Sequence, residues 1–277
     1  MSHNIGLIVT GQETAKELQI FIKTLELFHK DVVLWIGTDS KTDLSTLKHS
    51  IPINTKVFLD KYTGKTRQDM EALTGEQYNS LWTDFMYEKL TVIEWMFEVQ
   101  GSSQGVWFMD ADIIHCAPLP IIPEEATLAL SPHYIRTGDE NRFGKFNAGY
   151  LWIKDRSLLN EWRKAGYTST FYEQKALEQI VDKANLYEFP PNVNFGWWRM
   201  FQSSNPPQEI QSKFSIFRKE QGIGIRYNGL PLQSIHTHSG DVSYGYNGEF
   251  NRWLMKYLER LQSHSQARQW KQIVWSS

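Results

Sequence analysis

The first part of the chain alternates between short apolar runs and longer amphipathic segments. The apolar run 5–9 ends at Thr10 and Gly11, and the run 32–36 follows the segment 15–29, whose apolar residues recur three and four positions apart. Short apolar runs predict buried strands, and the three-four spacing predicts a helix. Strand, helix and strand in this order predict a parallel sheet with crossover helices.

Similar elements continue toward the C-terminus, and the pattern becomes mixed after the apolar run 106–109. Further strands are predicted at 57–59, 106–109, 127–130, 149–153 and 233–238, and further helices at 81–99, 158–164, 172–183 and 250–262. No internal repeat, low-complexity tract or clear linker interrupts the pattern. We therefore predict an α/β protein with one domain at 1–247, a mixed, mainly parallel central sheet, and a C-terminal amphipathic helix and extension at 248–277.

Ligands of parallel α/β sheets bind at the carboxyl ends of the strands. A nucleotide is therefore expected at Thr10 and Gly11 after the first run and at Thr38 and Asp39 after the second. The chain contains neither GxGxxG nor GxxxxGK(S/T), which argues against a dinucleotide-binding fold and against a P-loop.

Composition and charge exclude several classes of protein. The 277 residues, 41% of them hydrophobic, are enough for a substantial core, and the net charge of -2 argues against a nucleic-acid partner. The single cysteine, Cys116, excludes an internal disulfide framework and suits a reducing compartment. Neither a secretory leader nor a membrane-length apolar stretch occurs, so a soluble, cytoplasmic protein is expected.

Two carboxylates directly follow the run 106–109. Asp110 and Asp112 are separated by one residue at a predicted strand end, so both can approach one hard divalent cation, either Mn²⁺ or Mg²⁺. Such a cation can neutralise charge on a diphosphate leaving group. A solvated acidic turn is the alternative, and the buried strand before the pair favours the metal site.

One lysine interrupts an otherwise apolar helix face. Lys89 shares the face of the predicted helix 81–99 with apolar residues, namely Trp82, Met86, Ile93 and Phe97. Such a lysine must extend to the surface, be neutralised, or meet an anion. A donor phosphate becomes the better partner if this helix packs beside the strand that precedes Asp110.

Two further segments place polar groups next to apolar positions. Gln174 shares a helix face with Leu177 and Val181, and Glu173 precedes it; a helix-capping role is the alternative for this pair. Asn147 and Gly149 precede a predicted strand, where they offer an amide side chain and room for close approach of a ligand. An ordinary turn is the alternative there.

Two histidines lie on the same side of the late predicted strand. His236 and His238 are separated by one residue. Such a pair is more often structural than metal-binding, although one imidazole could complete a site with Asp110 and Asp112.

Taken in order along the chain, these motifs resemble the retaining glycosyltransferases of family 8 and their relatives, which include glycogenin and bacterial lipopolysaccharide galactosyltransferases. The resemblance covers roughly residues 5–240 and rests on five short matches: Tyr87-Glu-Lys89-Leu90, Phe108-Met-Asp110-Ala-Asp112, Phe146-Asn-Ala-Gly149, Glu173-Gln174 and Ile235-His236. It implies the GT-A fold, which is Rossmann-like and binds nucleotide-diphosphate sugars.

The resemblance also implies a role for each matched residue. Asp110, Asp112 and one of the two late histidines, His236 or His238, would bind Mn²⁺, and Ile235 before His236 favours the first. The remaining roles follow the family: Lys89 would contact the donor, Asn147 and Gly149 would line the sugar pocket, Gln174 would lie beneath the reacting sugar face, and Thr10 and Gly11 would hold base and ribose. The chain departs from the family where Glu173 replaces the commoner Asp and where no Lys follows the late histidine.

The resulting functional prediction is a metal-dependent glycosyltransferase. It would move a hexose from a nucleoside-diphosphate sugar, with UDP as the expected nucleotide, to a carbohydrate, lipid-linked or protein acceptor with retention of configuration. One alternative is a sugar-1-phosphate nucleotidyltransferase, although residues 10–13 do not form the glycine- and arginine-rich loop of that class. The other is a catalytically silent carbohydrate-binding protein of the same fold.

The C-terminal helix combines basic and apolar residues. Its cations are Arg252, Lys256, Arg260, Arg268 and Lys271, and its apolar side includes Trp253, Leu254, Tyr257, Leu258 and Leu261. A basic amphipathic helix with tryptophans can lie on an anionic membrane surface, which would be a weak peripheral contact. Packing of the apolar side on the rest of the protein is the alternative.

Overall fold

The computed structural model describes residues 3–101, 104–202, 206, 209–219, 222–237 and 245–263. The chain divides into two compact units. The first contains Met1–Ala15, Lys30–Ala111 and Ile121–Pro190, and the second contains Lys16–His29, Asp112–Pro120 and Pro191–Ser277. The boundary expected at 247/248 stays a prediction.

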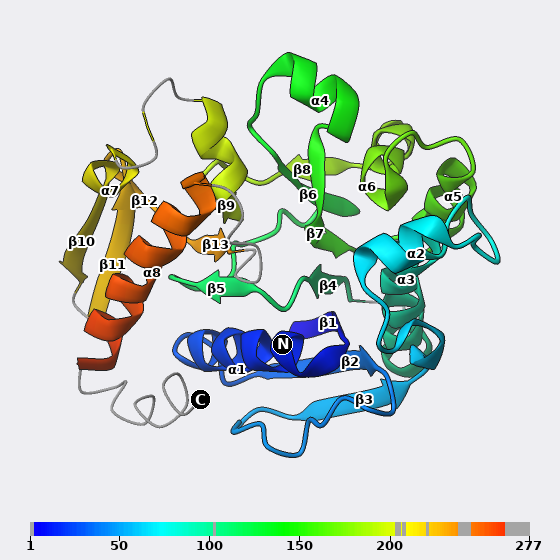
Figure 1. Cartoon of the computed structure of the whole chain (residues 1–277), viewed down its shortest axis with the longest axis horizontal. Helices are drawn as coiled ribbons and strands as arrows, with labels where there is room; N and C mark the ends of the chain where they lie inside the picture. Colours follow the sequence, from blue (N-terminus) through cyan, green and yellow to red (C-terminus); the bar gives the residue numbers. More distant parts are fainter. Residues whose placement is uncertain are drawn as a thin grey trace. The chain divides into compact units, whose positions relative to one another are not determined.

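A seven-stranded sheet organises the first unit, in the order β3-β2-β1-β4-β7-β6-β8 (Figure 1). β7 is antiparallel to both of its neighbours, whereas the other pairings are parallel. The strands are β1 (His3–Val9), β2 (Val32–Thr38), β3 (Ile53–Val57), β4 (Val106–Met109), β6 (Leu128–Pro132), β7 (Phe146–Ile153) and β8 (Leu186–Glu188). The predicted α/β class with a mixed, mainly parallel sheet is therefore confirmed.

Burial explains why the apolar runs form the centre of this sheet. All four residues of β4 are buried, and so are five of the seven positions of β1. A strand covered on both faces has no polar side to alternate with, so it appears in the sequence as a continuous apolar run. Strands of this kind were predictable from the pattern alone.

The longest helix of the first unit is α3 (Leu81–Gln100), whose buried face belongs to the main core. The Ser80 side chain accepts a hydrogen bond from the Thr83 N–H and caps the start of α3, which is typically worth about 1 kcal/mol. A Cβ at Gly6 would lie 2.6 Å from Met96 Cε, so α3 packs directly on the backbone of β1. The other helical elements are α2 (Arg67–Ala72), α4 (Thr137–Phe143), α5 (Ser157–Gly166) and a 3₁₀ turn at Asp60–Tyr62.

The predicted helix 172–183 is present only in short pieces. α6 (Tyr172–Ala176) is followed by 3₁₀ turns at Leu177–Gln179 and Val181–Lys183. Of the apolar residues predicted to face inward, Leu177 is fully buried and Val181 is partly buried against the main core. A 3₁₀ turn also brings residues three apart onto one side, so the apolar spacing does not distinguish it from an α-helix.

The second unit has two small sheets and its own core. α1 (Gly11–Glu26) belongs to this unit from Lys16 onward. One sheet has the order β5-β13-β9 and the other β10-β11-β12. The elements are β5 (Ile113–His115), β9 (Phe195–Gly196), a 3₁₀ segment at Trp197–Gln202, α7 (Ile210–Lys213), β10 (Phe214–Lys219), β11 (Gly222–Tyr227), β12 (Leu230–Pro231), β13 (Ser234–His236) and α8 (Gly245–Ser263).

The apolar side of α8 is used inside the second unit. The core of the second unit contains four residues of α8, all of them buried: Trp253, Leu254, Tyr257 and Leu258. The membrane contact considered for the C-terminal helix is therefore not supported, since these four apolar side chains are already buried in protein. Arg268 and Lys271 lie outside the described residues. No helix among the described ranges is long and apolar enough to cross a bilayer.

Candidate functional site

The two carboxylates occupy the short turn between β4 and β5. The Asp110 N–H donates to the carbonyl oxygen of Gly149 at 2.9 Å, which continues the pairing of β4 with β7 beyond the last strand residue. Both side chains are half-buried. The turn thus places two partly desolvated carboxylates at the carboxyl end of a central strand, as the sequence predicted.

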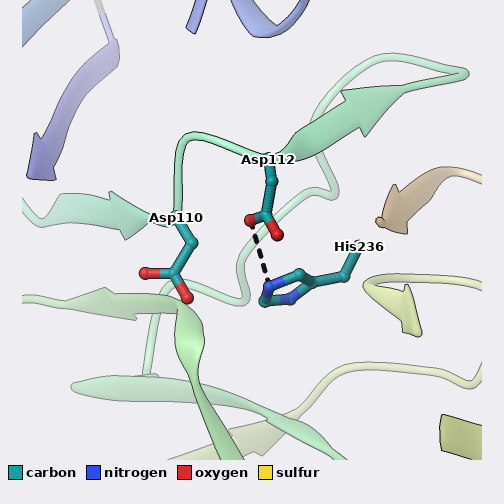
Figure 2. A group of neighbouring side chains, drawn as sticks. All are labelled: Asp110, Asp112 and His236. Carbon is teal, nitrogen blue, oxygen red and sulfur yellow. Dashed lines mark ion pairs between the residues drawn. The ribbon is translucent and has the colours of Figure 1, made fainter. Parts of the chain in front are cut away.

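His236 reaches this turn because β13 pairs with β5. In the register of that pairing His236 lies opposite Ile113, immediately after Asp112. The Thr237 N–H and hydroxyl both donate to the backbone oxygen of Asp112, at 3.2 and 2.9 Å. The imidazole is buried, and its Nε2 lies 3.2 Å from Asp112 Oδ1 (Figure 2).

Asp110, Asp112 and His236 form a potential metal-binding group. One ligand atom from each lies within 4.8 Å of the others. Atoms that bind one cation at about 2.0–2.2 Å lie at most about 4.4 Å apart, so small side-chain rotations would suffice. Two carboxylates with one imidazole suit a divalent cation such as Mn²⁺ or Mg²⁺.

The hydrogen bonding of His236 provides a test of this fit. Its Nδ1 lies 3.0 Å from Asn194 Oδ1, an oxygen that can only accept. Nδ1 therefore carries a proton, and in neutral imidazole the lone pair of Nε2 then faces the Asp112 carboxylate. Two acceptors in contact require a second proton on the ring or a cation between them. The residues present therefore fit a bound cation. His238 lies outside the described residues.

Lys89 is buried and neutralised by a carboxylate. Its Nζ lies 2.5 Å from Glu173 Oε1 and donates to the carbonyl oxygen of Ala148 at 3.3 Å. The ammonium also lies 5.2 Å from the centre of the Phe108 ring on β4. α3 therefore does pack beside the strand that precedes Asp110. The partner in this structure is Glu173, and a contact between Lys89 and a donor stays a prediction.

The backbone of Glu173 is held as firmly as its side chain. Trp162 Nε1 donates to the carbonyl oxygen of Glu173 at 2.7 Å. Gln174 points to a different partner, because its Nε2 donates to the carbonyl oxygen of Phe143 at 2.8 Å and so joins α6 to the end of α4. The two neighbouring residues are thus fixed in separate directions, Glu173 toward α3 and Gln174 toward α4.

Asn147 and Gly149 lie on either side of the carbonyl that Lys89 binds. Asn147 is buried, and its Oδ1 accepts from the Gly149 N–H at 3.0 Å. The Gly149 carbonyl accepts from Asp110, so a continuous set of contacts leads from Asp110 through the start of β7 to Lys89. The structure brings these four predicted site residues together.

Thr10 and Gly11 lie where β1 ends and α1 begins. Gly11 has φ 79°, a conformation that favours glycine, and its N–H donates to Thr42 Oγ1 at 2.7 Å. The same hydroxyl donates to the Asp39 carboxylate at 2.7 Å. Asp39 thus reaches Gly11 through Thr42, so the ends of β1 and β2 are joined. Thr42 carried no signal in the sequence, because it follows the strand end by several residues.

Burial shifts the pKa of Tyr87, a neighbour of Glu173. The Tyr87 side chain is buried next to α5, and burial first and the charge of Glu173 second raise the pKa of its hydroxyl well above the usual value. Its hydroxyl has no hydrogen-bond partner among the described residues. Tyr87 therefore stays protonated at physiological pH.

Comparisons by sequence and by structure give different results. No family model matches the chain, and no curated protein matches it by sequence. By structure it is similar to an active-site mutant of LgtC, with a TM-score of 0.51 and 13% identity over 91% of this chain and 95% of that one. It is also similar to the galactosyltransferase LgtC in complex with donor and acceptor sugar analogs, with a TM-score of 0.50 and 14% identity over the same shares of the two chains.

A third similar structure is a glycosyltransferase involved in the glycosylation of the major capsid of PBCV-1. It gives a TM-score of 0.50 and 9% identity over 92% of this chain and 100% of that one. The similarity extends over nearly the whole of each chain. The protein therefore has the GT-A glycosyltransferase fold, as the resemblance of its motifs implied.

Proposed function

We propose that this chain with the GT-A fold is a metal-dependent glycosyltransferase that uses a nucleoside-diphosphate sugar, with UDP as the nucleotide. The observation that carries the proposal is the group formed by Asp110, Asp112 and His236 at the end of β4. In an α/β sheet this end of a central strand is where ligands bind. The similar LgtC structure holds donor and acceptor sugar analogs, which supports the same two classes of ligand here.

The predicted site residues are assigned the following roles in this proposal. Asp110, Asp112 and His236 hold Mn²⁺ or Mg²⁺, and the bound cation supplies positive charge for a diphosphate leaving group. Thr10 and Gly11 hold the base and ribose. The fixed position of Gly11, with its N–H already engaged by Thr42, supports a preformed pocket rather than one that orders on binding.

The sugar is held near Lys89, at the end of the contacts that lead from Asp110 through the start of β7. Lys89 contacts the donor, and Asn147 and Gly149 line the sugar pocket. Gln174 lies beneath the reacting face of the sugar, with Glu173 as its neighbour in the chain. Because the Lys89–Glu173 pair is internally neutral, a neutral hexose can approach it without leaving an uncompensated charge. Catalysis then depends on positioning and on stabilisation of developing charge, with retention of configuration.

The acceptor is a carbohydrate, a lipid-linked sugar or a protein, and we place the protein in the cytoplasm. The fully buried thiol of Cys116 is compatible with a reducing compartment.

The decisive experiment combines binding with turnover. The full chain is screened by thermal shift against nucleotide sugars with Mn²⁺, and again with EDTA, because a ligand of the native state raises its melting temperature. Hydrolysis or transfer of the stabilising donor is then measured for the wild type and for Asp110→Ala. We expect a metal-dependent shift with one donor, and loss of turnover in the variant.

The alternatives would give different results. A nucleotidyltransferase would release pyrophosphate from a nucleoside triphosphate and a sugar 1-phosphate. A silent carbohydrate-binding protein would show stabilisation by sugars without turnover of any nucleotide sugar. Donor turnover at an unchanged rate in EDTA would overturn the metal-dependent mechanism.

A further inference from the structure

The second nitrogen of His236 has a partner that no sequence motif indicated. Asn194 is fully buried in the loop before β9, and its Oδ1 lies 3.0 Å from His236 Nδ1. An amide oxygen can only accept, so the contact keeps the ring proton on Nδ1. The lone pair of Nε2 is thereby directed at Asp112, the side on which a cation would bind.

The conformation of Asn194 is fixed from several sides. Its φ of 51° lies in the left-handed region, which asparagine tolerates better than most residues. Its N–H donates to Ser234 Oγ at 2.7 Å, which joins the loop to β13 two residues before His236. The Arg199 guanidinium donates to the carbonyl oxygens of Asn194 at 3.1 Å and of Val193 at 3.3 Å, and also to that of Pro191.

An aromatic side chain also contacts the imidazole. The Trp198 ring packs edge-to-face on His236, with ring centres 5.1 Å apart and an angle of 75° between the planes. Gly196 makes this approach available, since a Cβ there would lie 2.1 Å from Trp198 Cζ2. His236 therefore has a fixed ring plane as well as a fixed tautomer.

We propose that Asn194 is a positioning residue for the metal centre: it holds His236 as the tautomer and in the orientation that present Nε2 to a divalent cation. The proposal rests on the metal-binding role proposed above for Asp110, Asp112 and His236. Removal of the partner that binds the other ring nitrogen of a ligating histidine commonly weakens metal affinity by about 10–100-fold. In this scheme Asn194 acts on the metal centre through His236.

The test separates the amide from the backbone conformation. Asn194→Gly removes the acceptor while retaining easy access to positive φ, and Asn194→Asp retains an acceptor at the same position. Asn192→Gly, two residues earlier in the same loop, is the matched control, because that residue is only half-buried. Mn²⁺ alone is titrated into each full-length variant, and free Mn²⁺ is followed by its electron paramagnetic resonance signal.

We expect Asn194→Gly to bind Mn²⁺ about 10–100-fold more weakly, and Asn194→Asp and Asn192→Gly to bind about as tightly as the wild type. A second measurement uses ¹⁵N-labelled histidine. The wild-type imidazole of His236, assigned by its loss in His236→Ala, should show the Nδ1-protonated tautomer, and Asn194→Gly should show a mixture.

Two outcomes would overturn the proposal, and a third would refute the metal function on which it rests. Wild-type affinity in a folded Asn194→Gly, together with an unchanged tautomer, would show that the amide does not position His236. If Asn194→Gly does not fold, a folded Asn194→Asp that has lost Mn²⁺ affinity would overturn the proposal in the same way. Absence of Mn²⁺ binding by the wild type itself would instead refute the proposed metal function on which the inference rests.

Discussion

The buried pair of Lys89 and Glu173 allows a quantitative prediction. The two side chains are 2% and 6% exposed, and their charged atoms lie 2.5 Å apart. Removal of one partner from such a pair leaves an uncompensated buried charge, which costs about 3–5 kcal/mol. In Lys89→Met the lost hydrogen bond to Ala148 adds about 1 kcal/mol. We expect Lys89→Met to lose about 4 kcal/mol or more, a large part of the stability of a typical domain.

The double variant Lys89→Met with Glu173→Leu tests the reasoning from the other side. It removes both charges at similar side-chain volume, so its stability should return to within about 1.5 kcal/mol of the wild type. The double-mutant cycle should then give a favourable coupling energy of about 2 kcal/mol or more. If both side chains also contact the donor, the double variant should be folded but inactive.

Urea unfolding followed by tryptophan fluorescence measures these differences. The denaturant slope should be unchanged, so that the shift in midpoint reports stability alone. The effect of Lys89→Met should persist in high salt, because a buried pair is weakly screened. A loss of less than about 1 kcal/mol in Lys89→Met would refute the assignment of a desolvated ion pair. So would a double variant whose stability loss equals the sum of the losses in the two single variants.

Three further predictions concern single residues. His115 is fully buried, and this burial lowers its pKa to about 3. At a pH below the ordinary value of about 6.5, the unfolded chain binds a proton on this residue that the folded chain does not. Stability should therefore fall by about 1.4 kcal/mol for each pH unit toward acid. Urea unfolding at pH 7 and pH 5 should show this slope in the wild type and a shallower one in His115→Leu. Asp112→Ala should abolish transfer with a nearly unchanged melting temperature, and wild-type turnover by this variant in EDTA would contradict the metal role. Gly196→Ala should lose about 1–3 kcal/mol in the same unfolding assay, because its Cβ would lie 2.1 Å from Trp198; an unchanged midpoint would show that the ring moves freely.

The parts of the fold that the sequence predicted are those in which burial is local. β1 and β4 are apolar along nearly their whole length, because neither strand has a solvent face. β10 and β11 were missed, although Phe214–Lys219 and Gly222–Tyr227 both contain alternating apolar residues. β10 is an edge strand and β11 pairs with both β10 and β12, so pairing with neighbours rather than a continuous apolar run defines these strands.

The candidate site divides in the same way. Asp110 and Asp112 were predictable because they directly follow a recognisable strand. The inward position of Lys89 followed from helix periodicity, but its pairing with Glu173 did not, because the two residues are 84 positions apart. Asn194 was beyond prediction, since its role depends on how β9 and β13 pair and on a left-handed backbone that no pattern announces.

The bond from Thr237 to Asp112 joins residues 125 positions apart and has a consequence for how the protein folds. During synthesis, Asp110 and Asp112 leave the ribosome long before the segment that carries His236. β5 therefore cannot pair with β13 until that later segment has been synthesised. Pairings of such long sequence separation form slowly, because a large loop has to close first. We expect the seven-stranded sheet to be largely built before His236 docks beside Asp112. A divalent cation would then bind tightly only to chains that have finished folding, so holding the metal would mark the last step of assembly.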